Sequence, residues 1–71
     1  MYNLQKGFDK IKHTKSKDTI EIFKLSLQAI LKVGETQMYR YINGTTEMKA
    51  NQLFAVLDLF EKHGVKREEM R

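Results

Sequence analysis

The 71-residue sequence contains no cysteine and no proline. Without cysteine the chain forms neither a disulfide framework nor a thiolate metal site, so packing alone must stabilise a small core. No apolar run approaches the roughly 20 residues of a membrane span, and the first six residues, Met-Tyr-Asn-Leu-Gln-Lys, lack the apolar centre of a signal peptide. We therefore expect one small cytoplasmic domain without membrane association, whose modest core would gain from dimerisation.

Residue sets typical of catalysis are also missing. The two histidines, His13 and His63, are far apart, and neither lies near a serine or carboxylate at a spacing typical of a catalytic triad or a metal site. There is no glycine-rich phosphate-binding loop. We expect no catalytic activity, no metal or cofactor, and no small-molecule substrate.

Positive charge is in excess, with a net charge of +4, and it is concentrated over residues 10–17. A basic excess favours a polyanionic partner. We interpret residues 10–17 as a basic linker between the first two helices, whose lysines Lys12, Lys15 and Lys17 would contact DNA phosphates without reading sequence. The alternative is a linker whose lysines only keep it soluble.

The spacing of apolar residues predicts an all-α fold, a compact bundle of four, or five, short helices. The first helix begins near Leu4 and buries Phe8 and Ile11 on one face. Gly7 lies within this helix and costs some stability relative to alanine.

The second predicted helix starts after Asp18, which forms a capping signal with Glu21, and continues to about Val33. Its core face contains five apolar residues: Ile20, Phe23, Leu27, Ile30 and Leu31. Three more lie on the opposite side: Ile22, Leu25 and Ala29. A helix that is apolar on two sides is usually central, so we expect this helix to lie at the centre of the bundle.

Gly34 suits both the end of the second helix and the cap of a third over residues 35–42, which Asn43 and Gly44 terminate. Thr45 or Thr46 can cap a fourth helix that continues to about His63. Its predicted buried stripe is Ala50, Leu53, Val56, Leu57 and Phe60.

Three apolar residues lie outside this stripe, Phe54, Ala55 and Leu59, and we expect them to form a dimer interface. Residues 66–71 either begin a fifth helix or fray, so the core spans about residues 4–65.

The third predicted helix separates its side chains by face. At about 100° per residue, Met38, Tyr41 and Ile42 lie on one side. The other side carries groups that can read base edges in DNA: Thr36, Gln37 and Arg40, with Tyr39 beside them. Packing is an equally good interpretation of Tyr39, and a solvated surface position is the alternative for Arg40. Glu35 suits a helix N-terminus through the macrodipole, and base contact with cytosine is its second interpretation.

The segment Val-Gly-Glu-Thr-Gln-Met-Tyr-Arg-Tyr-Ile-Asn-Gly, residues 33–44, resembles the turn and recognition helix of small phage and prophage repressors of the Cro/XRE type. The family pattern is G-V-S-x-x-x-I-x-x-x-x-N-G, the resemblance covers roughly residues 18–65, and the ending over 59–65 looks like a divergent prophage-encoded group. It implies a lambda-repressor-like helix-turn-helix domain that represses transcription as a homodimer on double-stranded DNA. Its recognition helix would lie in the major groove of a pseudo-palindromic operator.

By position, the resemblance also implies the residues that contact DNA. Bases would be contacted by Glu35, Thr36, Gln37 and Arg40, with Tyr39 beside them. Phosphates would be contacted at and beyond the Asn-Gly stop, by Asn43, Thr45, Thr46 and Lys49. The chain departs from the family at Gln28 and Lys32, where alanine and glycine are preferred, and this predicts an unusual angle between the two helices.

The runner-up function is a protein-interaction module, an adaptor or antirepressor, built on the same scaffold. It would present Phe54, Leu59 and the Tyr39 side of the third helix to another protein. An RNA-binding variant lacks the exposed aromatic platform expected for stacking on single strands.

Overall fold

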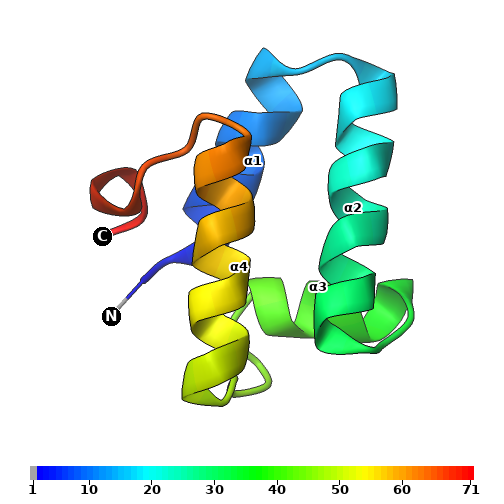
Figure 1. Ribbon diagram of the computed structural model, residues 1–71, viewed down its shortest axis with the longest axis vertical. Helices are drawn as coiled ribbons and strands as arrows, with labels where there is room; N and C mark the ends of the chain where they lie inside the picture. Colours follow the sequence, from blue (N-terminus) through cyan, green and yellow to red (C-terminus); the bar gives the residue numbers. More distant parts are fainter. Residues whose placement is uncertain (1) are drawn as a thin grey trace.

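The computed structural model describes residues 2–71, and these contain helices and no strands, as predicted (Figure 1). The elements are α1 (Leu4–Thr14), α2 (Lys17–Leu31), α3 (Glu35–Ile42), α4 (Ala50–Lys62) and a final 3₁₀ turn, η1 (Arg67–Met70). In Figure 1, α1, α2 and α4 stand side by side, and α3 crosses the lower end of the bundle. The bounds of α3 agree with the prediction from sequence.

Three phenylalanines form the centre of the core. Phe8 of α1 stacks on Phe23 of α2 with ring centroids 6.0 Å apart, and Phe23 lies 4.9 Å from Phe60 of α4. All three are almost fully buried. The main apolar stripes predicted for these three helices therefore face one another.

The connection between α1 and α2 is shorter than predicted. α1 continues to Thr14 and α2 begins at Lys17, so most of the basic segment is helical and only Lys15 and Ser16 join the two helices. The cap of α2 is Ser16, whose hydroxyl accepts a hydrogen bond from the backbone N–H of Thr19 at 3.2 Å. The predicted basic linker and the predicted Asp18 cap were therefore wrong; Asp18 lies in the first turn, where its charge suits the macrodipole.

The expectation that α2 is central was also wrong. One side of α2 packs on α4, α3 and α1, but the other side faces solvent. Ile22 is 59% exposed and Leu25 is 63% exposed. A helix at the edge of the bundle thus carries apolar side chains that the monomer does not cover.

The fourth helix starts later than predicted. Neither Thr45 nor Thr46 caps it; Lys49 is the N-cap residue, and its backbone N–H donates to the side-chain oxygen of Gln52 at 3.0 Å. Ala50 is exposed, whereas Leu59 is 7% exposed and belongs to the core. The predicted dimer interface was therefore wrong at Leu59, and only Phe54 of that set is strongly exposed, at 57%.

The C-terminal segment packs onto the bundle. Met70 and Val65 are buried, and an ion pair joins Glu69 to Lys10 of α1. Met70 lies over Gly7, where an added Cβ would come within 2.5 Å of its sulfur. Gly7 therefore allows α1 and η1 to approach closely, and the core extends beyond residue 65.

Candidate nucleic-acid interface

A tight turn joins α2 to α3 and fixes their relative orientation. Lys32 ends α2 in the left-handed conformation, with φ 57° and ψ 46°. The backbone N–H of Val33 donates to the carbonyl of Gln28 at 3.1 Å, and Gly34 then caps α3 in an extended conformation. Lys32, rather than Gly34, thus makes the turn, and it does so at the position where the resemblance placed a glycine.

Buried residues and one ion pair hold α3 against the bundle. Met38 and Ile42 are buried, as their spacing predicted, and Tyr41 is half-buried beside them. On the opposite edge, the Lys24 ammonium of α2 lies 3.0 Å from the Glu35 carboxylate. The hydrogen bond to Glu35, followed by that to Tyr39, raises the pKa of Lys24 above its ordinary value. The Glu35 carboxylate is therefore engaged within the protein.

Lys24 is a residue that the sequence analysis missed. Its side chain is only 14% exposed, and it lies between Glu21, at 3.6 Å, and Glu35. The i,i+3 spacing from Glu21 is a visible signal for one of these pairs. The contact with Glu35 depends on the angle between α2 and α3, which the local sequence does not reveal.

The Tyr39 side chain packs against neighbouring helices and is also partly exposed to solvent. Its ring meets the edge of Phe8 at a centroid distance of 5.9 Å, and the Lys24 ammonium lies 5.7 Å from its centroid. The residue is still 38% exposed. Tyr39 thus ties α3 to α1 and α2 while part of it remains at the surface.

The outward face of α3 carries polar groups that the protein does not use. Thr36, Gln37 and Arg40 are all exposed. Within residues 2–71, none of their side chains has a hydrogen-bond or ion-pair partner. The face therefore presents a hydroxyl, an amide and a guanidinium that are free to bind an external ligand.

A Schellman motif ends α3 beside this face. The backbone N–H of Thr45 donates to the carbonyl of Arg40 at 3.0 Å, and Gly44 adopts φ 84°. The Asn43 side-chain oxygen accepts from both the backbone N–H and the hydroxyl of Thr45, at 3.1 and 2.6 Å. The prediction that Asn43-Gly44 terminates this helix is confirmed, and the side chain of Asn43 has a structural role.

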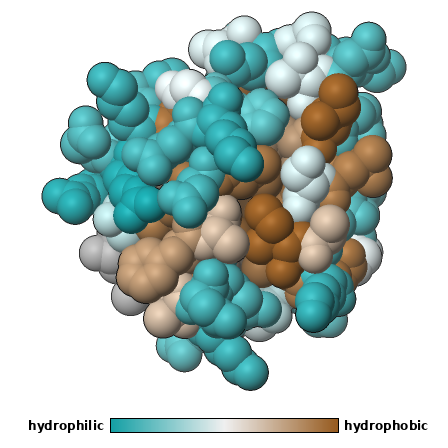
Figure 2. All heavy atoms as spheres, in the orientation of Figure 1, coloured by the Kyte–Doolittle hydropathy of each residue, from teal (hydrophilic) through white to brown (hydrophobic). Residues whose placement is uncertain are grey.

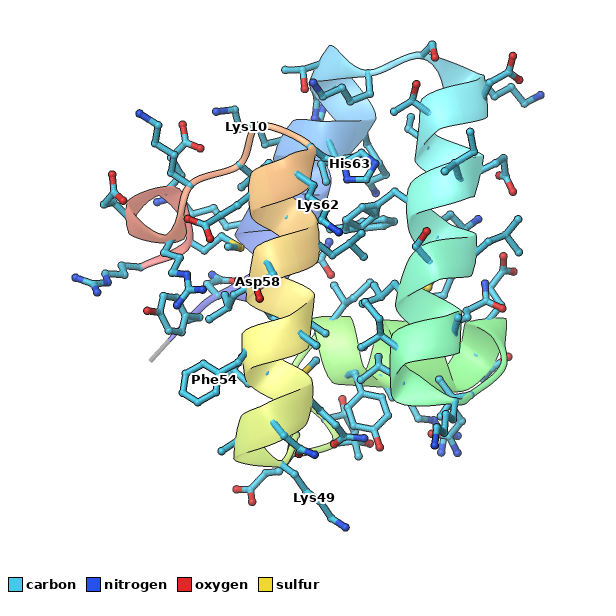
Figure 3. All side chains as sticks on the ribbon, in the orientation of Figure 1. Lys10, Lys49, Phe54, Asp58, Lys62 and His63 are labelled. Atoms are coloured by element: carbon cyan, nitrogen blue, oxygen red, sulfur yellow. The ribbon has the colours of Figure 1, made fainter. Side chains whose placement is uncertain are left out.

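Beyond the stop, Thr46 is half-buried and Lys49 is exposed. Figure 3 shows Lys49 extending from the lower end of the bundle, away from the core. Lys49 thus shares the end of the molecule to which α3 belongs.

The basic segment lies elsewhere. Lys12, Lys15 and Lys17 are exposed, but they surround the junction of α1 with α2, at the upper end of Figure 1, whereas α3 lies at the lower end. The 15 residues of α2 separate the two ends by about 22 Å. Lys12 also lies 3.7 Å from Asp9 and 5.1 Å from the Phe8 ring centroid. Lys15 and Lys17 therefore lie at the end of α2 away from the turn to α3, whereas Lys12 lies nearer α3, because the Phe8 ring beside it also contacts Tyr39.

The histidines have local roles at helix ends. His13 Nδ1 lies 2.6 Å from the carbonyl oxygen of Asp9, and His63 Nδ1 lies 3.0 Å from that of Leu59. Among residues 2–71 there is no group of three side chains of the metal-binding type. No helix in this described part of the chain has the length and apolarity to cross a membrane.

Comparison of the chain with protein-family models, with curated proteins and with solved structures finds no match.

Proposed function

We propose that the protein is a sequence-specific double-stranded DNA-binding regulator, with α3 as the helix that enters the major groove. The observation that carries the proposal is the outward face of α3, where Thr36, Gln37 and Arg40 are exposed and lack partners among residues 2–71. Such groups match base edges: arginine pairs with guanine and glutamine with adenine. Met38 and Ile42 anchor the same helix in the core, so the face is presented rigidly.

The other residues of α3 divide between structure and contact. We assign Glu35 to the ion pair with Lys24. The lysine offsets the negative charge of this carboxylate, which would otherwise repel phosphate. Tyr39 is assigned to the edge of the interface, where its exposed part can reach a thymine methyl.

Phosphate contacts are assigned to the end of α3 and not to the basic segment. Lys49 is exposed at the correct end of the molecule, and the Asn43–Thr45 turn presents polar groups beside it. We assign Lys12 to its contacts with Asp9 and the Phe8 ring, and we leave Lys15 and Lys17 out of this interface because they lie at the end of α2 opposite the turn to α3.

The proposal includes that the protein binds its operator as a homodimer. Two copies related by a two-fold axis would place their α3 helices in half-sites about 34 Å apart on a pseudo-palindrome. A regulator of this kind represses transcription by covering the operator.

The first test is selection of bound sequences from a random duplex library, followed by affinity measurements on the enriched site. Arg40→Ala and Gln37→Ala are each expected to cost about 1–3 kcal/mol on that site and to relax the base preference at one position. If Arg40→Ala retains the full preference of the wild type, the assigned recognition face is wrong.

Two lysine variants separate phosphate contact from general charge. Lys49→Ala should weaken binding to all duplexes alike and reduce the salt dependence, because one counterion-releasing contact is lost. Lys17→Ala removes the same charge from the opposite end and is the matched control; it should leave affinity and salt dependence nearly unchanged. Equal effects of the two substitutions would contradict the assigned phosphate contacts.

The exposed Phe54 ring favours one alternative function, a protein-interaction module. In Figure 3 this ring points away from α4 on the side opposite α2. Docking through apolar contacts changes little with salt, whereas DNA binding weakens steeply. A library selection without enrichment, from protein shown to be folded, would favour this alternative.

A further inference from the structure

Four exposed residues of α2 and its C-cap residue, Lys32, follow one another at heptad spacing and are together called the stripe. Asp18, Ile22, Leu25, Ala29 and Lys32 are separated by 4, 3, 4 and 3 residues. All five are exposed, and Ile22 and Leu25 retain more than half of their accessible surface. Figure 2 shows apolar atoms at the surface over α2, on the right of the view. Alternate spacings of three and four residues are the pattern by which one helix packs along another.

The charges at the two ends of this stripe are opposite. Asp18 lies in the first turn of α2, and Lys32 is its C-cap residue. Neither has an ion-pair partner within residues 2–71, although six ion pairs occur there. The stripe is therefore apolar in the middle, acidic at one end and basic at the other.

A stripe with this order is complementary to itself when it is reversed. With Leu25 at the centre, antiparallel alignment places Asp18 of one chain against Lys32 of the other, since each is seven residues from Leu25. The larger Ile22 and the smaller Ala29, three and four residues from the centre, then lie within one residue of the same level. A parallel alignment would instead place like charges together at both ends. Self-complementarity about a two-fold axis is the defining property of a symmetric dimer interface.

We propose that a second copy of this chain packs antiparallel along α2, through the stripe from Asp18 to Lys32. This interface replaces the α4 face predicted from sequence. On that face Leu59 is buried, and among the described residues Phe54 is the one large apolar side chain of α4 that is exposed. Self-association does not require DNA binding, so the two proposals are tested separately.

The antiparallel pairing has one consequence that rests on the proposed function. Each α3 follows the C-terminal end of its own α2, so the two α3 helices lie toward opposite ends of the dimer. From Leu25 to Lys32 is about 10 Å along the helix, which separates the two turns by about 20 Å along the axis. Because Glu35, at the start of α3, pairs with Lys24 at 3.0 Å, each α3 lies beside the C-terminal half of its own α2.

Sedimentation equilibrium of purified protein without DNA tests the interface. The wild type is expected to approach twice the 8.4 kDa mass of the chain as concentration rises. Asp18→Lys and Lys32→Asp should each raise the dissociation constant about tenfold or more, because the two-fold axis converts two attractive pairs into two repulsive ones. The matched control is Phe54→Lys on α4, which should leave the dissociation constant unchanged.

Mixing the two charge variants, Asp18→Lys and Lys32→Asp, is the decisive measurement. In a heterodimer, the introduced lysine of the first variant meets the introduced aspartate of the second, and the native Lys32 of the first meets the native Asp18 of the second. The mixture should therefore dimerise as the wild type does. Circular dichroism checks that each variant is folded.

A covalent trap gives an independent measurement of the same interface. Since the chain has no cysteine, Leu25→Cys supplies a single thiol on the two-fold axis and should oxidise to a covalent dimer. Phe54→Cys, on α4, should not.

Three results would overturn the proposal. The first is a wild type that remains monomeric up to millimolar concentration. The second is a mixture of the two charge variants that dimerises no better than either alone. The third is dissociation by Phe54→Lys, which would place the interface on α4.

Discussion

The contact between Gly7 and Met70 allows a double-mutant test of how the C-terminal turn is held. A Cβ built on Gly7 would lie 2.5 Å from the Met70 sulfur, 2.8 Å from its Cγ and 3.1 Å from Cε1 of Phe60. Met70 is fully buried, so its side chain cannot move away from Gly7 without disturbing its contacts in the core. Gly7→Ala should therefore disturb the packing of η1 on α1.

The magnitudes follow from two opposing effects. Alanine in place of glycine gains about 1 kcal/mol in helix propensity. Overpacking a filled core costs about 1–3 kcal/mol, so the net effect of Gly7→Ala in the wild type is a loss of about 1 kcal/mol. Met70→Ala alone should cost about 2–4 kcal/mol through lost burial and the cavity left behind. In the Met70→Ala background the clash is relieved, and Gly7→Ala should stabilise the protein by about 1 kcal/mol.

Urea unfolding followed by circular dichroism in the far ultraviolet measures all four proteins. The expected coupling between the two positions is about 2 kcal/mol, well above the roughly 0.5 kcal/mol within which independent sites add. Gly34→Ala is the control, because a Cβ there has no neighbour within 4 Å and should change stability equally in both backgrounds. If Gly7→Ala has the same effect with and without Met70, the close packing of η1 on α1 is wrong.

Two further predictions concern the turn and the pH dependence of stability. Lys32→Gly should stabilise the folded chain by about 1 kcal/mol in urea unfolding at micromolar concentration, because glycine adopts the left-handed conformation without strain. The control is Lys15→Gly, at a helix end where φ is −111°, which should bring no gain in stability. The hydrogen bond from Lys10, followed by that from the Lys66 backbone, lowers the pKa of Glu69 below its ordinary value of 4.5. The ionised Glu69 therefore stabilises the folded chain above pH 4.5, and this contribution is lost as the pH falls through the lowered pKa. The stability of Glu69→Gln should consequently fall less than that of the wild type on acidification below pH 4.5, and parallel curves for the two proteins would contradict this ion pair.

Much of the helical framework follows from the sequence, because periodicity and stop signals act over a few residues. The stripes that include Phe8, Phe23 and Phe60 were predicted as core faces, and these residues are buried. The bounds of α3 and its Asn43-Gly44 stop also followed from local patterns, since a Schellman motif is built within one turn of the helix.

Tertiary structure decided which apolar surfaces are covered. The sequence shows apolar residues on both sides of α2, but only packing reveals that Leu25 faces solvent while Leu59, predicted to be at the surface, is buried. The same holds for charge: a run of lysines in the sequence does not show that Lys17 begins α2 at the end opposite the turn to α3. The ion pair of Lys24 with Glu35 joins two consecutive helices, and the contact of Met70 with Gly7 joins the two ends of the chain. Local spacing of residues determined where the helices of this protein form. The angles between the helices arise from the fit of many side chains at once, and they determined which side chains are buried and which are exposed.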